Sequence, residues 1–85
     1  MVYIRGHALD FERWKSQGLP NWGYDCVLPY FRKSQTHELG ANAYRGGSGP
    51  LYTSLGKTKN ILFDKFIEAG LQTGYQFTED VNGYQ

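Results

Sequence analysis

Two short strings in the sequence carry residue types that bind phosphate or zinc in other proteins. Residues 56–58 read Gly-Lys-Thr, as at the end of a P-loop, but Leu51 stands where that loop needs its first glycine. His37 and Glu38 begin the zinc-binding pattern His-Glu-x-x-His, but Ala41 occupies the position of the second histidine. We therefore interpret both strings as polar loops and expect no P-loop and no metal site in this chain.

A glycine-rich stretch and the single cysteine are the other candidates. Residues 46–49 read Gly-Gly-Ser-Gly, without the Gly-x-Gly-x-x-Gly spacing of a dinucleotide-binding turn, and Pro50 follows where a helix should begin. Cys26 could pair with His7 or His37 as nucleophile and base, but their spacing does not support such a pair. The apolar neighbours of Cys26 instead predict a small buried hydrophobic residue. We assign no catalytic residue on these patterns.

The first predicted helix follows the extended N-terminal segment. Asp10 is the expected N-cap, because its carboxylate can accept hydrogen bonds from the free amides of the first turn. Phe11 and Trp14 are three residues apart and therefore share one face of this helix. Gly18 suits the left-handed conformation that often follows a helix.

Two more helices are predicted further along the chain. The second runs from about residue 25 to 35 with Asp25 as its cap, and Pro29 predicts a break within it because proline removes a backbone donor. The third, residues 61–73, has apolar residues at helical spacing and Asn60 as a candidate cap.

Short strands and long loops account for the remainder. Residues 1–5 are predicted to be a short strand or an extended entry. Strands are predicted at residues 51–54 and 75–77, a loop at 37–50 and an Asn-Gly turn within 78–83. The fold class is thus α+β: a mostly helical small chain with about three helices, two or three short strands and long loops. Helical spacing predicts that most aromatic residues pack in the interior rather than form a binding cage.

Composition excludes several classes of protein. The chain has 85 residues, a formal net charge of +1 and a single cysteine, so it can form one small domain without an internal disulfide. The near-neutral charge lacks the basic surface of a protein that binds nucleic acid. No apolar run has the roughly 20 residues of a membrane span, and the N-terminus does not read as a signal peptide.

Longer stretches resemble one enzyme family. Residues 1–14, which begin Met-Val-Tyr-Ile-Arg-Gly-His, and residues 22–34 resemble the glucose–methanol–choline (GMC) flavoprotein oxidoreductases. Residues 44–52 (Tyr-Arg-Gly-Gly-Ser-Gly-Pro-Leu-Tyr) and 74–85 are similar to the choline-oxidising members of that family. The likeness covers essentially the whole chain.

The resemblance implies an FAD cofactor and a small part in holding it. The family's FAD-contact motif, Gly-Gly-Ser-Ser-x-Ile-Asn-x-Met-x-Tyr, enters this sequence only at its end, where Met1 and Tyr3 match and Val2 fills the variable place. Met1 and Val2 are therefore expected to contact FAD in an intact enzyme. Its main Gly-x-Gly-x-x-Gly motif would precede Met1. His7 and His37 fall outside the family's catalytic motif and inherit no catalytic role.

The resemblance also implies how the chain is divided and what its parent enzyme does. The chain would be one internal fragment, with residues 1–36 ending the FAD-contact motif and connecting helices and residues 37–85 starting the substrate-binding domain. The parent would oxidise choline to betaine aldehyde, in glycine betaine synthesis, by hydride transfer to flavin. It would act on the cytoplasmic side and in association with a membrane, and the isolated chain would be inactive.

Two alternatives stay open at the level of sequence. The chain could be a non-catalytic interaction module derived from such an enzyme, or part of another alcohol dehydrogenase of the family. A fragment should expose apolar faces that the rest of its enzyme covers. Ile61, Phe63, Phe66 and Phe77 are the residues that could then mediate self-association.

Overall fold

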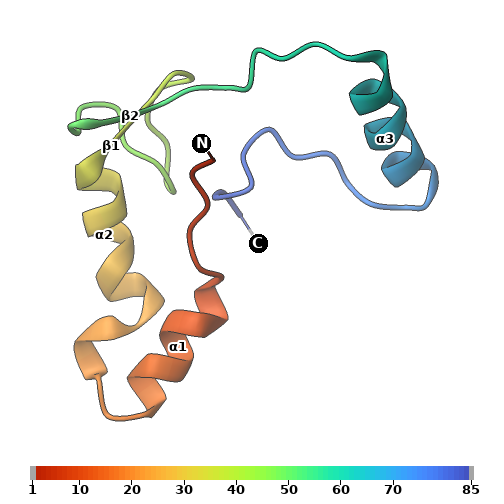
Figure 1. The fold of residues 1–85 in the computed structure, drawn as a ribbon. Coiled ribbons are helices and arrows are strands. Elements are labelled where there is room, and N and C mark those ends of the chain that lie inside the picture. Colours follow the sequence, from red (N-terminus) through yellow and green to blue (C-terminus); the bar gives the residue numbers. More distant parts are fainter. Residues whose placement is uncertain (1, 85) are drawn as a thin grey trace.

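The computed structural model describes residues 2–84 and shows an elongated molecule of 46 × 30 × 21 Å. Two helices and two strands lie together on one side, and a third helix stands apart at the end of two long connections (Figure 1). The elements in chain order are α1 (Ala8–Ser16), the 3-10 turn η1 (Pro20–Trp22), α2 (Tyr24–Ser34), β1 (Gln35–His37), β2 (Leu51–Thr53) and α3 (Ile61–Gln72).

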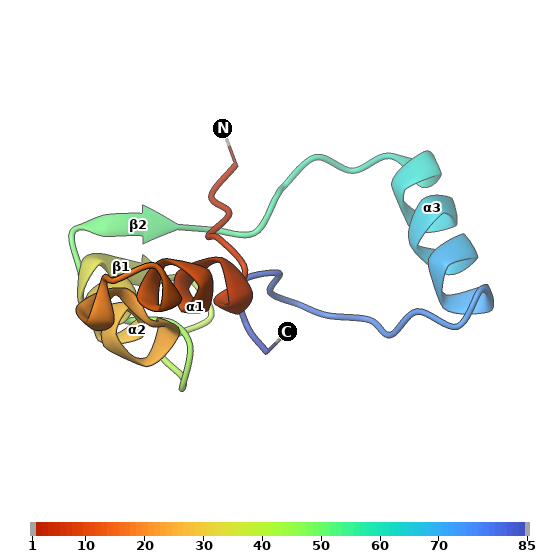
Figure 2. The same cartoon turned by 90° about the horizontal axis from the view of Figure 1, so that it is seen from below.

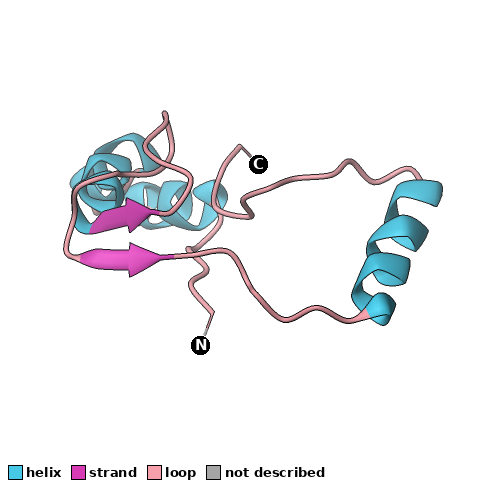
Figure 3. Cartoon of the chain, turned by 90° about the horizontal axis from the view of Figure 1, so that it is seen from above, coloured by secondary structure: helices cyan, strands magenta, loops and turns pink. Residues whose placement is uncertain are grey.

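This set of elements confirms the predicted α+β class. Strands β1 and β2 form a parallel pair in which Gln35 lies opposite Leu51 and His37 opposite Thr53 (Figure 3). A loop rather than a helix joins them, which is long enough for the crossover that parallel strands need. The strand predicted at residues 75–77 is wrong, because these residues have no strand partner, and residues 2–5 are an extended entry rather than a strand.

Helix α1 begins earlier than predicted. His7 is its N-cap and accepts a hydrogen bond from the Leu9 amide, while the Asp10 carboxylate accepts one from the His7 amide. This reciprocal pair is a capping box, so Asp10 lies inside the first turn and its prediction as N-cap is wrong. Gly18 has a φ of 100°, which confirms the left-handed position after the helix.

Helix α2 continues through Pro29, and the predicted break is wrong. The proline lies in the second turn, where its missing amide removes a single bond of the helical ladder. Asp25 is not the cap either. Gly23 is the N-cap, and the Glu12 carboxylate of α1 accepts the hydrogen bond of the Tyr24 amide instead.

The loop between β1 and β2 begins one residue later than predicted, because His37 still belongs to β1. Its glycine-rich stretch lies directly against the end of α2. A Cβ atom on Gly46 would collide with the carbonyl oxygens of Arg32 and Gln35, and one on Gly49 would collide with the backbone of Ser34. These glycines allow two backbone segments to touch, and that is their role here rather than phosphate binding.

Helix α3 is the most accurately predicted element. Asn60 is its N-cap and accepts a hydrogen bond from the Leu62 amide, and Gly74 follows its end with a φ of 94°. The helix stands away from the rest of the protein in both views of the ribbon (Figures 1 and 2). We call residues 56–78, which contain α3 and parts of its two connections, the α3 loop. Just before this loop, the Leu55 amide donates to the Glu38 carboxylate.

Apolar burial is confined to the contact between α1 and α2. Phe11 is the only buried apolar side chain among residues 2–84, and its ring lies 5.4 Å from that of Trp14 and 5.7 Å from that of Phe31. Packing of the aromatic residues is confirmed in this cluster only, since most of the others are exposed. Cys26 is exposed, so its prediction as a buried residue is wrong.

The close approach at Gly46 can be tested by adding one methyl group. Gly46→Ala should lower the free energy of unfolding by about 1–3 kcal/mol, because the backbone of α2 must move to admit the new atom. Thermal unfolding followed by circular dichroism measures the change. Gly56→Ala is the matched control, since nothing lies within 4 Å of its Cβ position. Equal stabilities of the two variants would contradict the close contact.

Candidate functional site

The interior of this protein is mainly polar. Arg5, Gln35, His37, Arg45 and Asn82 are all at most 9% exposed, and the Asp80 side chain is 11% exposed. They come from the N-terminal segment, β1, the loop after it and the C-terminal tail, which lie side by side in Figure 1. We call these six residues the polar cluster.

Arg5 uses its guanidinium group to join the N-terminal segment to β1. Its Nη2 donates to Gln35 Oε1 at 2.5 Å, its Nη1 donates to the Tyr44 carbonyl at 2.5 Å and its Nε donates to the Tyr3 hydroxyl at 3.1 Å. The guanidinium carbon also lies 4.9 Å from the centre of the Phe31 ring. Neutral acceptors and an aromatic face therefore take the place of the water lost on burial.

Asp80 is the negative centre of the cluster. One carboxylate oxygen accepts a hydrogen bond from Arg45 Nη1 at 3.1 Å and lies 3.9 Å from His37 Nε2. The other accepts a hydrogen bond from the backbone amide of Asn82 at 2.9 Å. Burial by itself raises the pKa of Asp80. The Asn82 amide, Arg45 and His37 outweigh that effect, so the pKa lies below its ordinary value.

A backbone amide holds the His37 ring in one orientation. Its Nδ1 accepts the amide hydrogen of Leu39 at 3.0 Å. In the neutral imidazole the proton is therefore on Nε2, which faces Asp80. Nδ1 is thus engaged by the backbone, whereas Nε2 lies 3.9 Å from an Asp80 carboxylate oxygen, beyond hydrogen-bond distance.

Asn82 joins the C-terminal tail to the N-terminal segment. Its Oδ1 accepts the Arg5 amide hydrogen at 2.7 Å, and its Nδ2 donates to the Tyr3 carbonyl at 3.0 Å. The Arg5 amide and the Tyr3 carbonyl point to one edge of the extended segment, whereas the amide and carbonyl of Ile4 point to the opposite edge. Among the residues that the structure describes, these two groups of Ile4 have no hydrogen-bond partner.

An open cavity of about 320 Å³ lies against this junction. Val2, the one predicted cofactor contact that the structure describes, lines it and is 80% exposed. His37, Asp80 and Asn82 line the same cavity. Met1, the other predicted contact, lies outside the described residues. The structure therefore brings Val2 together with the polar cluster, which the sequence did not predict.

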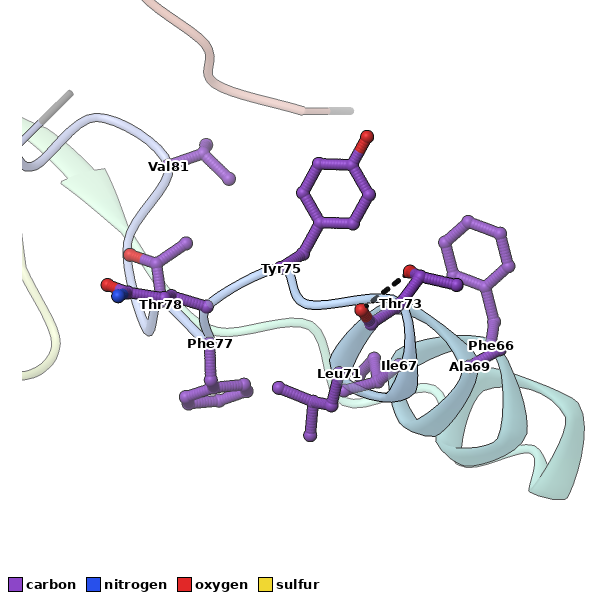
Figure 4. Close-up of a pocket in the computed structure, with 11 residues that line it drawn as sticks. Phe66, Ile67, Ala69, Leu71, Thr73, Tyr75, Phe77, Thr78 and Val81 are labelled. Atoms are coloured by element: carbon purple, nitrogen blue, oxygen red, sulfur yellow. Dashed lines mark hydrogen bonds between the residues drawn. The ribbon is translucent and has the colours of Figure 1, made fainter.

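A second open cavity, of about 630 Å³, lies between α3 and the tail (Figure 4). Its lining is almost entirely apolar, and Leu71 and Phe77 approach each other across it. Tyr75 is its only titratable side chain. This cavity has the character of an uncovered packing face rather than of a reaction site.

The other sequence candidates stay apart from the polar cluster. Residues 56–58 form an open loop before α3, and His7 caps α1. Within residues 2–84 the structure has no group of three His, Cys, Asp or Glu side chains that could hold a metal ion. None of the helices described is long and apolar enough to cross a membrane.

Sequence reasoning missed the polar cluster because no local pattern marks it. Arg5 is 30 positions from Gln35 and 77 positions from Asn82, the two residues that it binds. One signal was available: Asp80 to Gly83 reads as a turn, and the Gly83 amide does donate to the Asp80 carbonyl. That signal predicts the turn but not what its side chains contact.

Comparison with known proteins assigns the chain to a family. The sequence profile described as GMC oxidoreductase matches residues 1–85, so this chain belongs to the GMC oxidoreductase family. It is 60% and 59% identical to the mitochondrial choline dehydrogenases of Mus musculus and Homo sapiens over 85 residues. It is 54% identical to the oxygen-dependent choline dehydrogenase of Xanthomonas campestris pv. campestris (strain B100). The chain spans 14–16% of the length of these relatives.

The charge of Asp80 should make stability depend on pH. Because its pKa is lower in the folded state, its contribution is present above about pH 4 and is lost as the pH falls through the lower pKa of the folded protein. Asp80→Asn should lower the free energy of unfolding by about 1.5–3 kcal/mol at pH 7. This difference from wild type should shrink as the pH falls below about 4.

Denaturant unfolding at a series of pH values measures this difference. Asp64→Asn changes an exposed aspartate of α3 and is the control for loss of charge, with an expected change of less than about 0.5 kcal/mol. An Asp80→Asn difference that is the same at pH 7 and pH 3 would contradict the assigned role of the carboxylate.

Proposed function

We propose that this chain is part of an FAD-dependent choline dehydrogenase that oxidises choline to betaine aldehyde. The observation that carries the proposal is the identity of 53–60% over the whole chain with relatives named choline dehydrogenase. The aligned region includes residues 44–52 and 74–85, which carry the resemblance to choline-oxidising enzymes.

Within that enzyme we assign two parts to the chain. Residues 1–36 end the FAD-contact motif and form the connecting helices, and residues 37–85 start the substrate-binding domain. The apolar side chains of α3 support the assignment: Ile61, Leu62 and Phe66 are 69–81% exposed and need a covering surface. In the isolated chain these faces would favour self-association, in which Phe63 and Phe77 would also take part.

The residues beside Val2 fit one side of an FAD ring system. Val2 and Ile4 expose apolar side chains, and the backbone of Ile4, which has no partner among residues 2–84, offers a donor and an acceptor. When bound, FAD would supply the acceptor for the hydride that leaves the alcohol carbon. Residues 46–49 do not fit its phosphates, because they lie against the backbone of α2.

The role of the chain in the reaction is therefore to hold and orient the flavin. His37 accepts the Leu39 amide hydrogen at Nδ1, and His7 accepts the Leu9 amide hydrogen at Nδ1 to cap α1. Nδ1 of each histidine is therefore not available to take the hydroxyl proton of an alcohol. The base that does so belongs to another part of the enzyme.

The substrate can be tested directly on the protein expressed from its full reading frame. Anaerobic addition of choline should bleach the flavin absorption near 450 nm, as expected when the alcohol gives up its hydride. Ethanol and glucose are the control alcohols and should bleach it much more slowly. If the protein carries FAD, and another alcohol but not choline reduces the flavin, the assignment of choline as substrate is contradicted.

The contact of Val2 can be tested through the reduction potential of the flavin. Val2→Asp adds a negative charge beside the ring and should lower the two-electron potential by about 30 mV or more, a factor of ten in the equilibrium. Val2→Asn has the same shape without the charge and should leave the potential close to that of the wild type. Equal potentials for both variants would show that Val2 does not face the ring.

A further inference from the structure

We propose that Asn82 is a positioning residue for the cofactor: its carboxamide holds residues 3–5 on one edge and so fixes where Val2 meets the flavin. This inference rests on the proposed function, because it takes Val2 to be a flavin contact. It assigns a role to the C-terminal turn, which no sequence pattern connects to the cofactor.

The first step of the argument is the geometry of the contact. The two hydrogen bonds of the Asn82 side chain reach the Arg5 amide and the Tyr3 carbonyl at 2.7 and 3.0 Å. In a parallel β-sheet the amide and carbonyl of one residue of the neighbouring strand would make the same two bonds. Asn82 thus takes the place of a neighbouring strand along the edge that carries the Arg5 amide and the Tyr3 carbonyl. The opposite edge, with the amide and carbonyl of Ile4, has no partner among the described residues.

The second step is that Asn82 is itself firmly held. It is 6% exposed, and its own amide donates to the carboxylate of Asp80. Arg45 binds that carboxylate and also donates through Nε to the Gly40 carbonyl at 2.9 Å. The loop after β1 therefore fixes the tail, and the tail fixes the N-terminal segment.

The third step is the residue type. Only a carboxamide offers a donor and an acceptor at this spacing: aspartate would set an oxygen against the Tyr3 carbonyl, and alanine would leave both backbone groups unpaired. Residues 3–5 have no other regular backbone partner among the described residues, so loss of Asn82 leaves the segment that carries Val2 held mainly by the Arg5 side chain.

The test compares three forms of the complete flavoprotein. Asn82→Ala should weaken FAD binding about tenfold, shift the flavin absorption bands and speed deuterium exchange at the Arg5 amide in the cofactor-free form. Asn82→Asp keeps the acceptor for the Arg5 amide and should give an intermediate result. Asn60→Ala is the matched control: it also removes a bond from an asparagine side chain to a backbone amide, but at the start of the distant α3.

The outcomes separate this inference from the proposed function. Faster exchange at Arg5 together with weaker FAD binding in Asn82→Ala, and neither in Asn60→Ala, supports it. A lower melting temperature in Asn82→Ala with unchanged FAD affinity and spectrum would overturn it and would leave the proposed function intact. A wild-type protein that binds no FAD would overturn both.

Discussion

A single carboxylate organises this structure. Asp80 binds Arg45 from the loop after β1 and the amide of Asn82, and Asn82 in turn binds the backbone on both sides of Ile4. Every buried side-chain nitrogen and oxygen among the described residues has a hydrogen-bond partner. Such bonds require particular directions as well as contact, so this network defines how the two ends of the chain meet.

Apolar burial has a smaller part. Phe11 is the only apolar side chain that is buried within residues 2–84, and the side chains of α3 are exposed almost throughout. This balance agrees with a chain that spans 14–16% of the length of its relatives. The hydrophobic surface that normally drives folding is present, but its partners are not among these residues.

The sequence predicts the features that depend on near neighbours. Helix α3, its Asn60 cap and the left-handed glycines at 18 and 74 are confirmed, because each depends on a few adjacent residues. The predicted break at Pro29 is wrong because α2 tolerates the loss of a single backbone bond. Strand β1 and the polar cluster could not be predicted, since their partners are distant in sequence. Val2 could be named only through the family resemblance.

The position of α3 at the end of two long connections has a consequence for how the chain can vary. Two contacts hold the ends of the α3 loop, residues 56–78, in place. The Leu55 amide donates to the Glu38 carboxylate before this loop, and Arg45 binds the Asp80 carboxylate after it. The entropy of closing such a loop rises only slowly with length, by about 0.6 kcal/mol for each doubling. Insertions, deletions or a different helix between residues 56 and 78 can therefore accumulate over evolution, and can be engineered, without disturbing these two contacts.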